Sequence, residues 1–459
     1  MNKFKDVVVL LPGITGSVLA ARGKEVWSPS AGSLWRAVKS FGESITGLEL
    51  DADDPSEVTA PRLIPDITII PRFMKIDGYT RIEEYLIAQL GLERGRNYFP
   101  FPYDWRLDNR INAERLARTA HQWLTDWRTS SGAGDARLVL IGHSMGGLVA
   151  RHFLECREGW KQTRALITLG TPHQGALNAV DFLVNGMKKG IGPVGLDLSP
   201  LLRSYPSVYQ LLPIYRCIDG GNGDMLHVAE AADKGLLPHV KADWARAARA
   251  FHQEIEEAQK SNAQLSDYRE DGYKLVPLVG IEQPTLQSAI VNGSTVTLMR
   301  SFQGNDDGGD GTVPRVSATP IELEKQEREI FAAEMHGSLQ NADGALANVR
   351  GFLMKPSTDV SLFRAELPPP LTLDVDDVVA AGEPLIVRAR AADANPPIHV
   401  VLTLLTGETA GPPIVEALAR RQGESWREGE FDLPAGTWRV RIESEGAAPV
   451  TDLVVVAAA

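Results

Sequence analysis

The stretch that decides the fold is Arg137–Gly147, which reads RLVLIGHSMGG. Its first half is a continuous apolar run, typical of a strand buried on both faces of a parallel sheet. Its second half contains GHSMG, a G-x-S-x-G pattern centred on Ser144, and the residues after it continue at helical spacing. A strand, a tight turn with a serine at its tip and a helix form the nucleophile elbow of the α/β-hydrolase fold. The alternative is a glycine-rich turn without function, but strand and helix then stand on the matching sides only by chance.

Strand and helix patterns alternate on both sides of this stretch. Apolar runs predict strands, and apolar residues at helical spacing predict helices. Residues 20–75 show no clear pattern. The alternation elsewhere indicates βαβ units and a parallel sheet. We expect strands at Val7–Leu11, Arg164–Leu169 and Tyr273–Gly280, and a strand running into a loop over Tyr98–Trp105. Helices are expected at Tyr79–Leu90, Asn112–Trp127 and Leu148–Glu155.

Two segments depart from the alternation. Residues 174–270 lack a strand-like run and carry apolar clusters and one long polar helix, which predicts an inserted, mostly helical cap. After the linker Pro368–Pro370, short half-buried strands alternate to the end of the chain, typical of an immunoglobulin-like β-sandwich. We expect an α/β-hydrolase domain over residues 1–360, with its cap at about 174–270, and a small all-β domain over 366–459.

Composition excludes some function classes. The chain has 459 residues and a formal net charge of −12. Such a chain lacks the basic stripe of a nucleic-acid-binding protein and the polybasic anchor of a membrane-bound one. Its two cysteines, Cys156 and Cys217, stand in no metal-ligand spacing and are interpreted as buried thiols in a reducing compartment. We expect no metal and no cofactor.

The N-terminus favours a protein without a leader. The apolar run Val7–Leu11 is short and ends in Pro12-Gly13 without a small-residue cleavage site, which predicts a buried strand and not a signal peptide. No stretch approaches the ~20 apolar residues of a membrane-spanning helix. We therefore expect a cytoplasmic protein that reaches lipid from solution, with peripheral membrane contact as a variant. Trp27 and Trp35 are candidates for insertion at a membrane interface, the alternative being that they pack beneath the loop.

A serine nucleophile needs a general base, and in this fold the order is serine, acid, histidine. His336, in the short polar loop Glu334–Ser338, is the candidate base, the alternative being an exposed loop histidine. His173, in TPHQG, follows a strand and is a candidate for the pocket mouth, but it precedes any plausible acid. The remaining histidines are set aside as candidates for the base. His143 beside the nucleophile is interpreted as structural, and the others lie in helical runs that are surface or core (His121, His152, His239 and His252), in the cap (His227) and in the all-β domain, which we call the tail (His399).

The acid is expected between Ser144 and His336, just after a strand. Asp310 in GDGTVP (residues 309–314) fits, because glycines on both sides let the backbone turn the carboxylate inward. Other carboxylates in this interval compete for the role. A calcium loop is a further alternative, although calcium takes six to eight oxygen ligands and the neighbouring residues do not supply them. The competing acids are Asp219, Asp224, Asp306 and Asp307.

Two backbone amides are candidates for an oxyanion hole. The elbow places the Met145 N–H at a helix N-terminus, where it points at a developing negative charge. The second donor is expected from the loop after an early strand. LPGITG (residues 11–16) is such a loop, and its candidate donor is the Ile14 N–H.

Taken together, seven motifs resemble the lecithin:cholesterol acyltransferase family, which includes lysosomal phospholipase A2 and phospholipid:diacylglycerol acyltransferases. They are LPGITGS (11–17), YDWR (103–106), GHSMGG (142–147), LGTPHQG (169–175), SYPSVYQLLP (204–213), GDGTVP (309–314) and HGS (336–338), and the resemblance covers about residues 5–355.

The resemblance implies an α/β-hydrolase fold with a helical cap, in which Ser144, Asp310 and His336 form the triad and the Ile14 and Met145 amides form the oxyanion hole. It also implies, from YDWR, that Asp104 and Arg106 lie near the site and that Trp105 shapes the acyl pocket. Family members cleave acyl esters of lipids through an acyl-serine, and some pass the acyl group to an alcohol.

The chain departs from the family in lacking the cysteine pairs and signal peptide of secreted animal members, and in its β-rich tail. These departures favour a bacterial-type intracellular esterase or lipase. The leading hypothesis is a serine hydrolase that cleaves acyl esters of lipids or phospholipids through an acyl-Ser144 intermediate. The alternatives are an acyltransferase with an alcohol acceptor, a carboxylesterase for short esters, and a non-catalytic binding protein. For the tail, contact with a partner or a second copy is an additional hypothesis.

Overall fold

The computed structural model describes residues 4–28, 48, 50, 58–65, 67–70, 74–186, 188–191, 194–221, 223–323, 329–355, 368–380, 382–391, 396–406, 411–420 and 425–457. At its centre is a parallel sheet in the order β17-β14-β9-β8-β1-β7. The predicted parallel sheet with helices is therefore confirmed. Its strands are β1 (Val7–Leu11), β7 (Tyr98–Pro100), β8 (Leu138–His143), β9 (Thr163–Leu169), β14 (Lys274–Gly280) and β17 (Ile330–Ala332).

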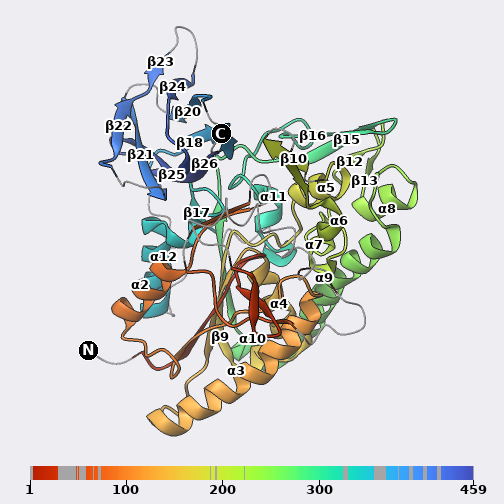
Figure 1. The fold of residues 1–459 in the computed structure, drawn as a ribbon. Helices are drawn as coiled ribbons and strands as arrows, with labels where there is room; N and C mark the ends of the chain where they lie inside the picture. Colours follow the sequence, from red (N-terminus) through yellow and green to blue (C-terminus); the bar gives the residue numbers. More distant parts are fainter. Residues whose placement is uncertain are drawn as a thin grey trace.

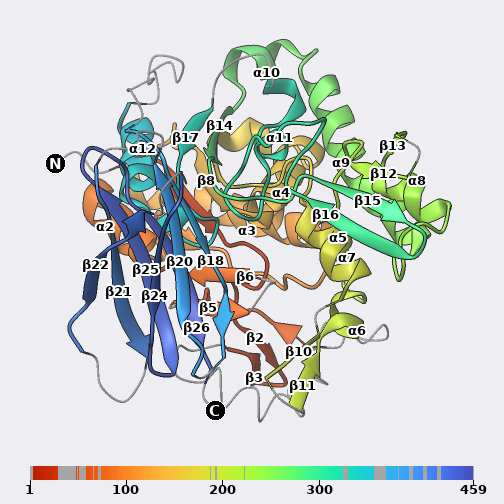
Figure 2. The same ribbon diagram turned by 90° about the horizontal axis from the view of Figure 1, so that it is seen from above.

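Helices cover both faces of this sheet. α2 (Thr80–Leu90) packs beside α12 (Asp343–Met354) on one side, and α3 (Asn109–Ser131) packs on α4 (Met145–Cys156) on the other (Figures 1 and 2). α3 begins before the predicted residue because the Asp108 side chain accepts a hydrogen bond from the Arg110 N–H, which caps the helix.

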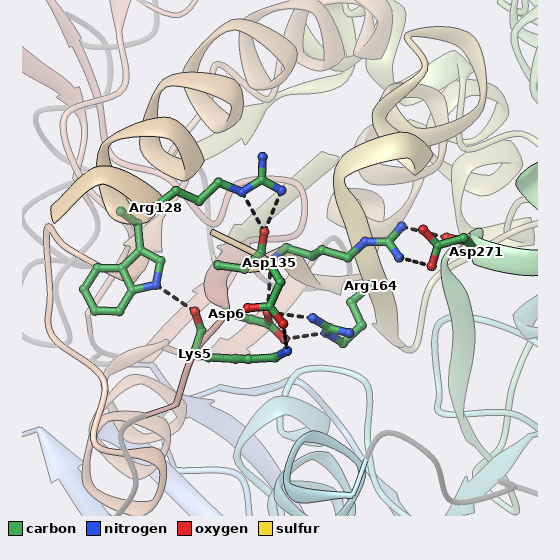
Figure 3. A network of polar contacts seen from close by, with 9 residues as sticks. Lys5, Asp6, Arg128, Asp135, Arg164 and Asp271 are labelled. Atoms are coloured by element: carbon green, nitrogen blue, oxygen red, sulfur yellow. Dashed lines mark hydrogen bonds and ion pairs between the residues drawn. The ribbon is translucent and has the colours of Figure 1, made fainter. Parts of the chain in front are cut away.

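A polar network ties together the amino ends of the central strands (Figure 3). Asp6, just before β1, accepts hydrogen bonds from the Arg164 guanidinium of β9 and from the backbone N–H of Arg137, just before β8. Lys5 pairs with Asp135 in the same cluster. Ser144 lies at the opposite, carboxyl end of β8. Ligands of open α/β sheets bind beyond the carboxyl ends of the strands. The network therefore stabilises the amino end of the sheet, opposite to the end at which Ser144 lies.

The segment between β1 and α2 holds short antiparallel strands where no pattern was expected. Trp27, at the end of β3, is buried, donates from Nε1 to the Thr15 carbonyl, and packs edge-on against Trp105. It therefore packs beneath the loop and is not available for a membrane interface, whereas Trp35 lies outside the described residues. The strands are β2 (Leu19–Ala21), β3 (Lys24–Trp27), β4 (Val58–Thr59), β5 (Ile67–Ile70) and β6 (Met74–Asp77).

The expected cap is mostly helical, but the prediction that it lacks strands is wrong. β10 and β11 form a hairpin, and β12 joins a small sheet with β13, β15 and β16. These strands have two to five residues, too short to give an alternating pattern. His239 lies in a turn with a φ of 64° and not in a helix.

The elements of the cap and of the segment after it are α5 (Leu177–Val184), β10 (Lys188–Ile191), β11 (Val194–Asp197), α6 (Ser199–Leu202), α7 (Pro206–Tyr209), β12 (Ile218–Asp219), β13 (Met225–Leu226), α8 (Val228–Asp233), α9 (Ala242–Asn262), α10 (Ser266–Asp271), β15 (Ser288–Asn292), β16 (Thr295–Met299) and α11 (Arg315–Ala318). Short 3₁₀ helices lie at Gly159–Gln162, Ile321–Leu323 and Leu339–Asn341. No helix within the described ranges has the length and apolar character needed to cross a bilayer.

The tail consists of two β-sheets, ordered β18-β20-β24-β23 and β19-β26-β25-β21-β22. Trp438, Val440 and Ile442 alternate into the core between them, as their spacing predicts. The immunoglobulin-like class and the domain limits stay predictions. The tail lies above β17 and α12 in Figure 1. Its strands are β18 (Leu371–Val375), β19 (Val378–Val379), β20 (Leu385–Ala391), β21 (Ile398–Thr406), β22 (Ile414–Ala417), β23 (Ala419–Arg420), β24 (Arg427–Phe431), β25 (Gly436–Ser444) and β26 (Val450–Val456).

Candidate active site

Ser144 sits at a sharp turn between β8 and α4. Its φ of 52° and ψ of −127° lie in a region that residues other than glycine rarely adopt. Its own N–H donates to the Leu169 carbonyl of β9 at 2.9 Å, which fixes the turn on the sheet. The local geometry is therefore the strained strand–turn–helix expected of a nucleophile elbow.

The glycines of the motif allow three segments to meet at this turn. A Cβ on Gly146 would lie 2.4 Å from the Pro12 carbonyl oxygen, and one on Gly147 would lie 2.0 Å from Thr171 Oγ1. The start of α4 therefore packs directly on the backbone of the loop after β1. Gly13 of that loop is so close that its added Cβ would lie 2.9 Å from the Cβ of Ser144. The LPGITG loop thus borders the serine, and its part in an oxyanion hole stays a prediction.

The structure brings Ser144, His336 and Asp310 together. His336 Nε2 is 2.9 Å from Ser144 Oγ, and His336 Nδ1 is 2.7 Å from Asp310 Oδ2. All three side chains are buried. A carboxylate accepts a hydrogen bond from the Nδ1–H group, which leaves Nε2 unprotonated and able to accept a hydrogen bond from the serine hydroxyl. The arrangement has the geometry of a nucleophile, a base and an orienting acid.

Asp310 is held firmly on its other side. Its Oδ1 accepts hydrogen bonds from the backbone N–H groups of Thr312 at 3.0 Å and Val313 at 2.7 Å. Two of the competing carboxylates bind elsewhere: Asp306 accepts from Gln287 and from the Gly308 N–H, and Asp219 accepts from backbone amides of its own turn. Among the described residues, no three His, Cys, Asp or Glu side chains form a group that would hold a metal ion.

Both candidate oxyanion donors border this serine. Met145 is the first residue of α4, and Ile14 follows Gly13 in the loop packed against Ser144. Neither amide donates to another group in the described part of the chain. Two amides at a helix N-terminus and an adjacent loop can stabilise a negatively charged oxygen.

A buried chain of hydrogen bonds joins the LPGITG loop (residues 11–16), which we call the oxyanion loop after its candidate role, to the backbone of His336. The Gly13 N–H donates to Tyr79 Oη at 2.8 Å, Tyr79 Oη lies 2.8 Å from His143 Nδ1, and His143 Nε2 lies 3.0 Å from the His336 carbonyl oxygen. Because a carbonyl only accepts, His143 carries its proton on Nε2, and the Tyr79 hydroxyl donates to Nδ1. Burial lowers the pKa of His143 to about 3, so this imidazole stays neutral.

His143 is therefore placed as a structural contact, in line with the sequence prediction. Tyr79 was missed, since a single tyrosine at the start of a predicted helix has no motif to mark it. Only the packing of α2 against the elbow brings its hydroxyl between Gly13 and His143.

The four candidate pocket residues have other contacts. Asp104 and Arg106 form a buried bidentate ion pair. Trp105 donates from Nε1 to the Ser17 carbonyl. His173 is buried, its ring 3.3 Å from Thr168 Oγ1, and burial holds its pKa well below the usual value. Their part in a substrate pocket stays a prediction.

Tyr103, at the head of YDWR, holds the loop that carries the Ile14 amide. Its hydroxyl donates to the Pro12 carbonyl at 2.7 Å, and its N–H donates to Ser17 Oγ. YDWR thus holds both ends of the LPGITGS loop through Tyr103 and Trp105.

Comparisons with known proteins point to one family. The chain is 28% identical over 240 residues to lecithin-cholesterol acyltransferase-like 4 of Arabidopsis thaliana, covering 45% of this chain and 42% of that protein. It is also 28% identical over 239 residues to phospholipase A(1) LCAT3 of the same plant, covering 45% of this chain and 52% of that protein. The matches thus span about half the length of these relatives.

Solved structures of lipases are also similar. The mature lipase BlEst2 of Bacillus licheniformis matches with 12% identity and a TM-score of 0.34, covering 76% of this chain and 91% of that one. Phospholipase PlaB of Legionella pneumophila matches with 8% identity and a TM-score of 0.25, covering 98% and 90%.

A family model described as lecithin:cholesterol acyltransferase matches residues 73–343. The match includes Ser144, Asp310 and His336, whereas the Ile14 loop and the tail lie outside it. Because it spans more than half of the sequence, the chain belongs to the lecithin:cholesterol acyltransferase family.

Proposed function

We propose that this chain is a serine hydrolase that cleaves the acyl esters of lipids through an acyl-Ser144 intermediate. The observation that carries the proposal is the buried contact series from Ser144 Oγ to His336 Nε2 and from His336 Nδ1 to Asp310 Oδ2. Family membership supports a lipid ester as substrate, and one relative is named a phospholipase A(1).

In the first step, His336 Nε2 takes the proton of Ser144 Oγ as the oxygen attacks the ester carbonyl. Asp310 keeps the imidazole in the tautomer with its proton on Nδ1 and stabilises the imidazolium that forms. His336 then gives the proton to the leaving alcohol, and an acyl-serine remains. In the second step, water or an alcohol attacks the acyl group with the same base assisting.

The negative charge that forms on the carbonyl oxygen needs donors in place before the reaction. The Ile14 and Met145 N–H groups are our candidates, because both border Ser144 and neither is bonded to another described group. Each such donor contributes roughly 10²–10³ to the rate.

The acceptor distinguishes two versions of the proposal. Water gives a lipase or phospholipase. An alcohol gives an acyltransferase, and the name of one relative favours this version. We adopt water as the default.

The test is hydrolysis of p-nitrophenyl esters of increasing chain length, with phosphatidylglycerol and phosphatidylcholine vesicles in parallel. We expect turnover that rises with chain length, extends to vesicles and falls roughly 10⁵–10⁶-fold in Ser144→Ala. Ser130→Ala, a change of an exposed serine in α3, is the matched control and should retain wild-type rates.

A long-chain alcohol added to the same assay separates the two acceptors, because transfer yields a new ester in place of free fatty acid. Turnover of short esters alone would indicate a carboxylesterase. Turnover that persists in Ser144→Ala would refute the proposal.

A further inference from the structure

Gln283 links one sheet of the tail to the segment that carries Asp310. The side chain of Gln283, fully buried, donates from Nε2 to the Leu371 carbonyl at 2.9 Å and accepts the Leu373 N–H on Oε1 at 3.0 Å. Its backbone pairs in both directions with Gly309, the residue before Asp310, at 3.0 and 3.1 Å. One glutamine therefore bridges strand β18 of the tail and the loop of the acid.

A second buried side chain connects the tail to the loop of the base. Glu334 Oε1 accepts the Thr451 N–H of strand β26 at 2.7 Å and the Met335 N–H at 3.0 Å. Met335, directly before His336, packs against the hydrophobic core of the tail. The loop that carries the base is thus attached to the tail through both residues that precede it.

The other side of the same loop is attached through Lys75. Its Nζ lies 2.7 Å from Asp452 Oδ2 and 2.6 Å from Asp377 Oδ1, both in the tail. Its backbone packs so closely on Gly337 that a Cβ there would lie 2.0 Å from the Lys75 carbonyl oxygen. A cavity of about 170 Å³ at this junction is lined by His336 and by Asp452 together.

We infer that the tail contributes to the geometry of the active site. Gln283 and Glu334 are positioning residues, through which the tail holds the loop of Asp310 and the loop of His336 in place. The inference rests on the proposed function. Asp310 and His336 stand on loops, and displacement of a reacting group by about 1 Å can cost about 10² in rate. A tail that serves as a spacer or a partner-binding module needs no buried bonds to both loops.

The chemistry of Glu334 suggests a conservative variant. Burial raises its pKa to about 8, so the carboxyl is largely neutral at pH 7. A glutamine is neutral, has nearly the same shape and keeps an oxygen that can accept the Thr451 and Met335 N–H groups. Alanine removes that acceptor.

The experiment compares full-length Gln283→Leu, Glu334→Ala and Glu334→Gln with wild type. The control is Arg388→Gln, which breaks the exposed tail pair Arg388–Glu428. Each protein is assayed below its unfolding temperature for kcat and KM on a p-nitrophenyl ester, and for the rate at which a fluorophosphonate labels Ser144.

We expect kcat and the labelling rate to fall about 10–100-fold in Gln283→Leu and Glu334→Ala, with KM within about twofold. Glu334→Gln and Arg388→Gln should stay within about threefold of wild type. If Gln283→Leu and Glu334→Ala lower the melting temperature but leave kcat and the labelling rate at wild-type values, the tail only stabilises the folded state and the inference is wrong. A wild type without turnover or Ser144 labelling overturns the proposed function and the inference with it.

Discussion

Removal of one hydroxyl group, in Tyr79→Phe, tests whether the oxyanion loop and the base are coupled. The Tyr79 hydroxyl accepts the Gly13 N–H at 2.8 Å and donates to His143 Nδ1 at 2.8 Å, and the side chain is 1% exposed. Phenylalanine fills the same space but leaves a buried donor and a buried acceptor without partners. As a result, we expect the Gly13–Ile14 peptide to shift away from its present position.

The size of the effect follows from these two groups. Each buried polar group left unpaired costs about 1–3 kcal/mol, so the free energy of unfolding should fall by about 2–6 kcal/mol. Complete loss of an oxyanion donor costs roughly 10²–10³ in rate. A displaced Ile14 amide retains part of its contact with the negatively charged oxygen of the transition state, so kcat should fall roughly 10–100-fold. KM should change little, because the donor acts mainly on the charge of the transition state.

The assay is kcat and KM on a p-nitrophenyl ester at a temperature where the variant is folded, together with thermal unfolding. Tyr85→Phe, a change within helix α2, which begins directly after Tyr79, lies outside the network and is the matched control. A Tyr79→Phe enzyme that loses stability but retains wild-type kcat would refute the coupling. Its network would then be only structural.

Three other predictions follow from the geometry. Gly146→Ala should abolish activity or folding, because its Cβ would lie 2.4 Å from the Pro12 carbonyl oxygen; circular dichroism and turnover check this. Asp104→Asn should lower the free energy of unfolding by about 3–5 kcal/mol, since it removes the carboxylate charge that pairs with the buried Arg106 guanidinium. An unchanged denaturation midpoint with altered chain-length preference would instead indicate a pocket role. Burial raises the pKa of Glu334 from 4.5 to about 8, so the folded state retains a proton that the unfolded state loses. Stability from this group is therefore complete below pH 4.5 and is lost as pH rises through 8, and Glu334→Gln should flatten that decline in denaturant titrations.

The contact of Ser144, His336 and Asp310 was predictable because its sequence signals are local, whereas the catalytic roles of these residues stay a proposal. The elbow needs glycines where three chain segments meet, and such constraints leave a short motif in the sequence. The position of Asp310 follows from chain order in the fold and from the glycines beside it. The structure then brings Ser144, Asp310 and His336 within hydrogen-bond distance.

The contacts that surround the triad were not predictable, because they join residues far apart in the chain. Tyr79 and Glu334 stand in no motif, and their roles appear only when helix α2 and strand β26 are placed beside the site. The Asp104–Arg106 pair shows the converse. The motif was recognised, but it did not reveal that the two side chains bind each other.

The alternating pattern of the tail predicted β-strands and a buried face that contains Trp438, and both are present in the structure. Alternation marks which residues face the core of a sheet but not which surface the sheet contacts. The bonds of Gln283 to the tail therefore could not be foreseen.

The most direct test of the central claim is covalent labelling of the full-length protein with a long-chain alkyl fluorophosphonate, followed by peptide mapping by mass spectrometry. We expect a single adduct on Ser144, no adduct in Ser144→Ala, and labelling slowed by several orders of magnitude in His336→Gln. An adduct on another residue, or equal labelling rates in wild type and His336→Gln, would contradict the claim that His336 activates Ser144 as the nucleophile.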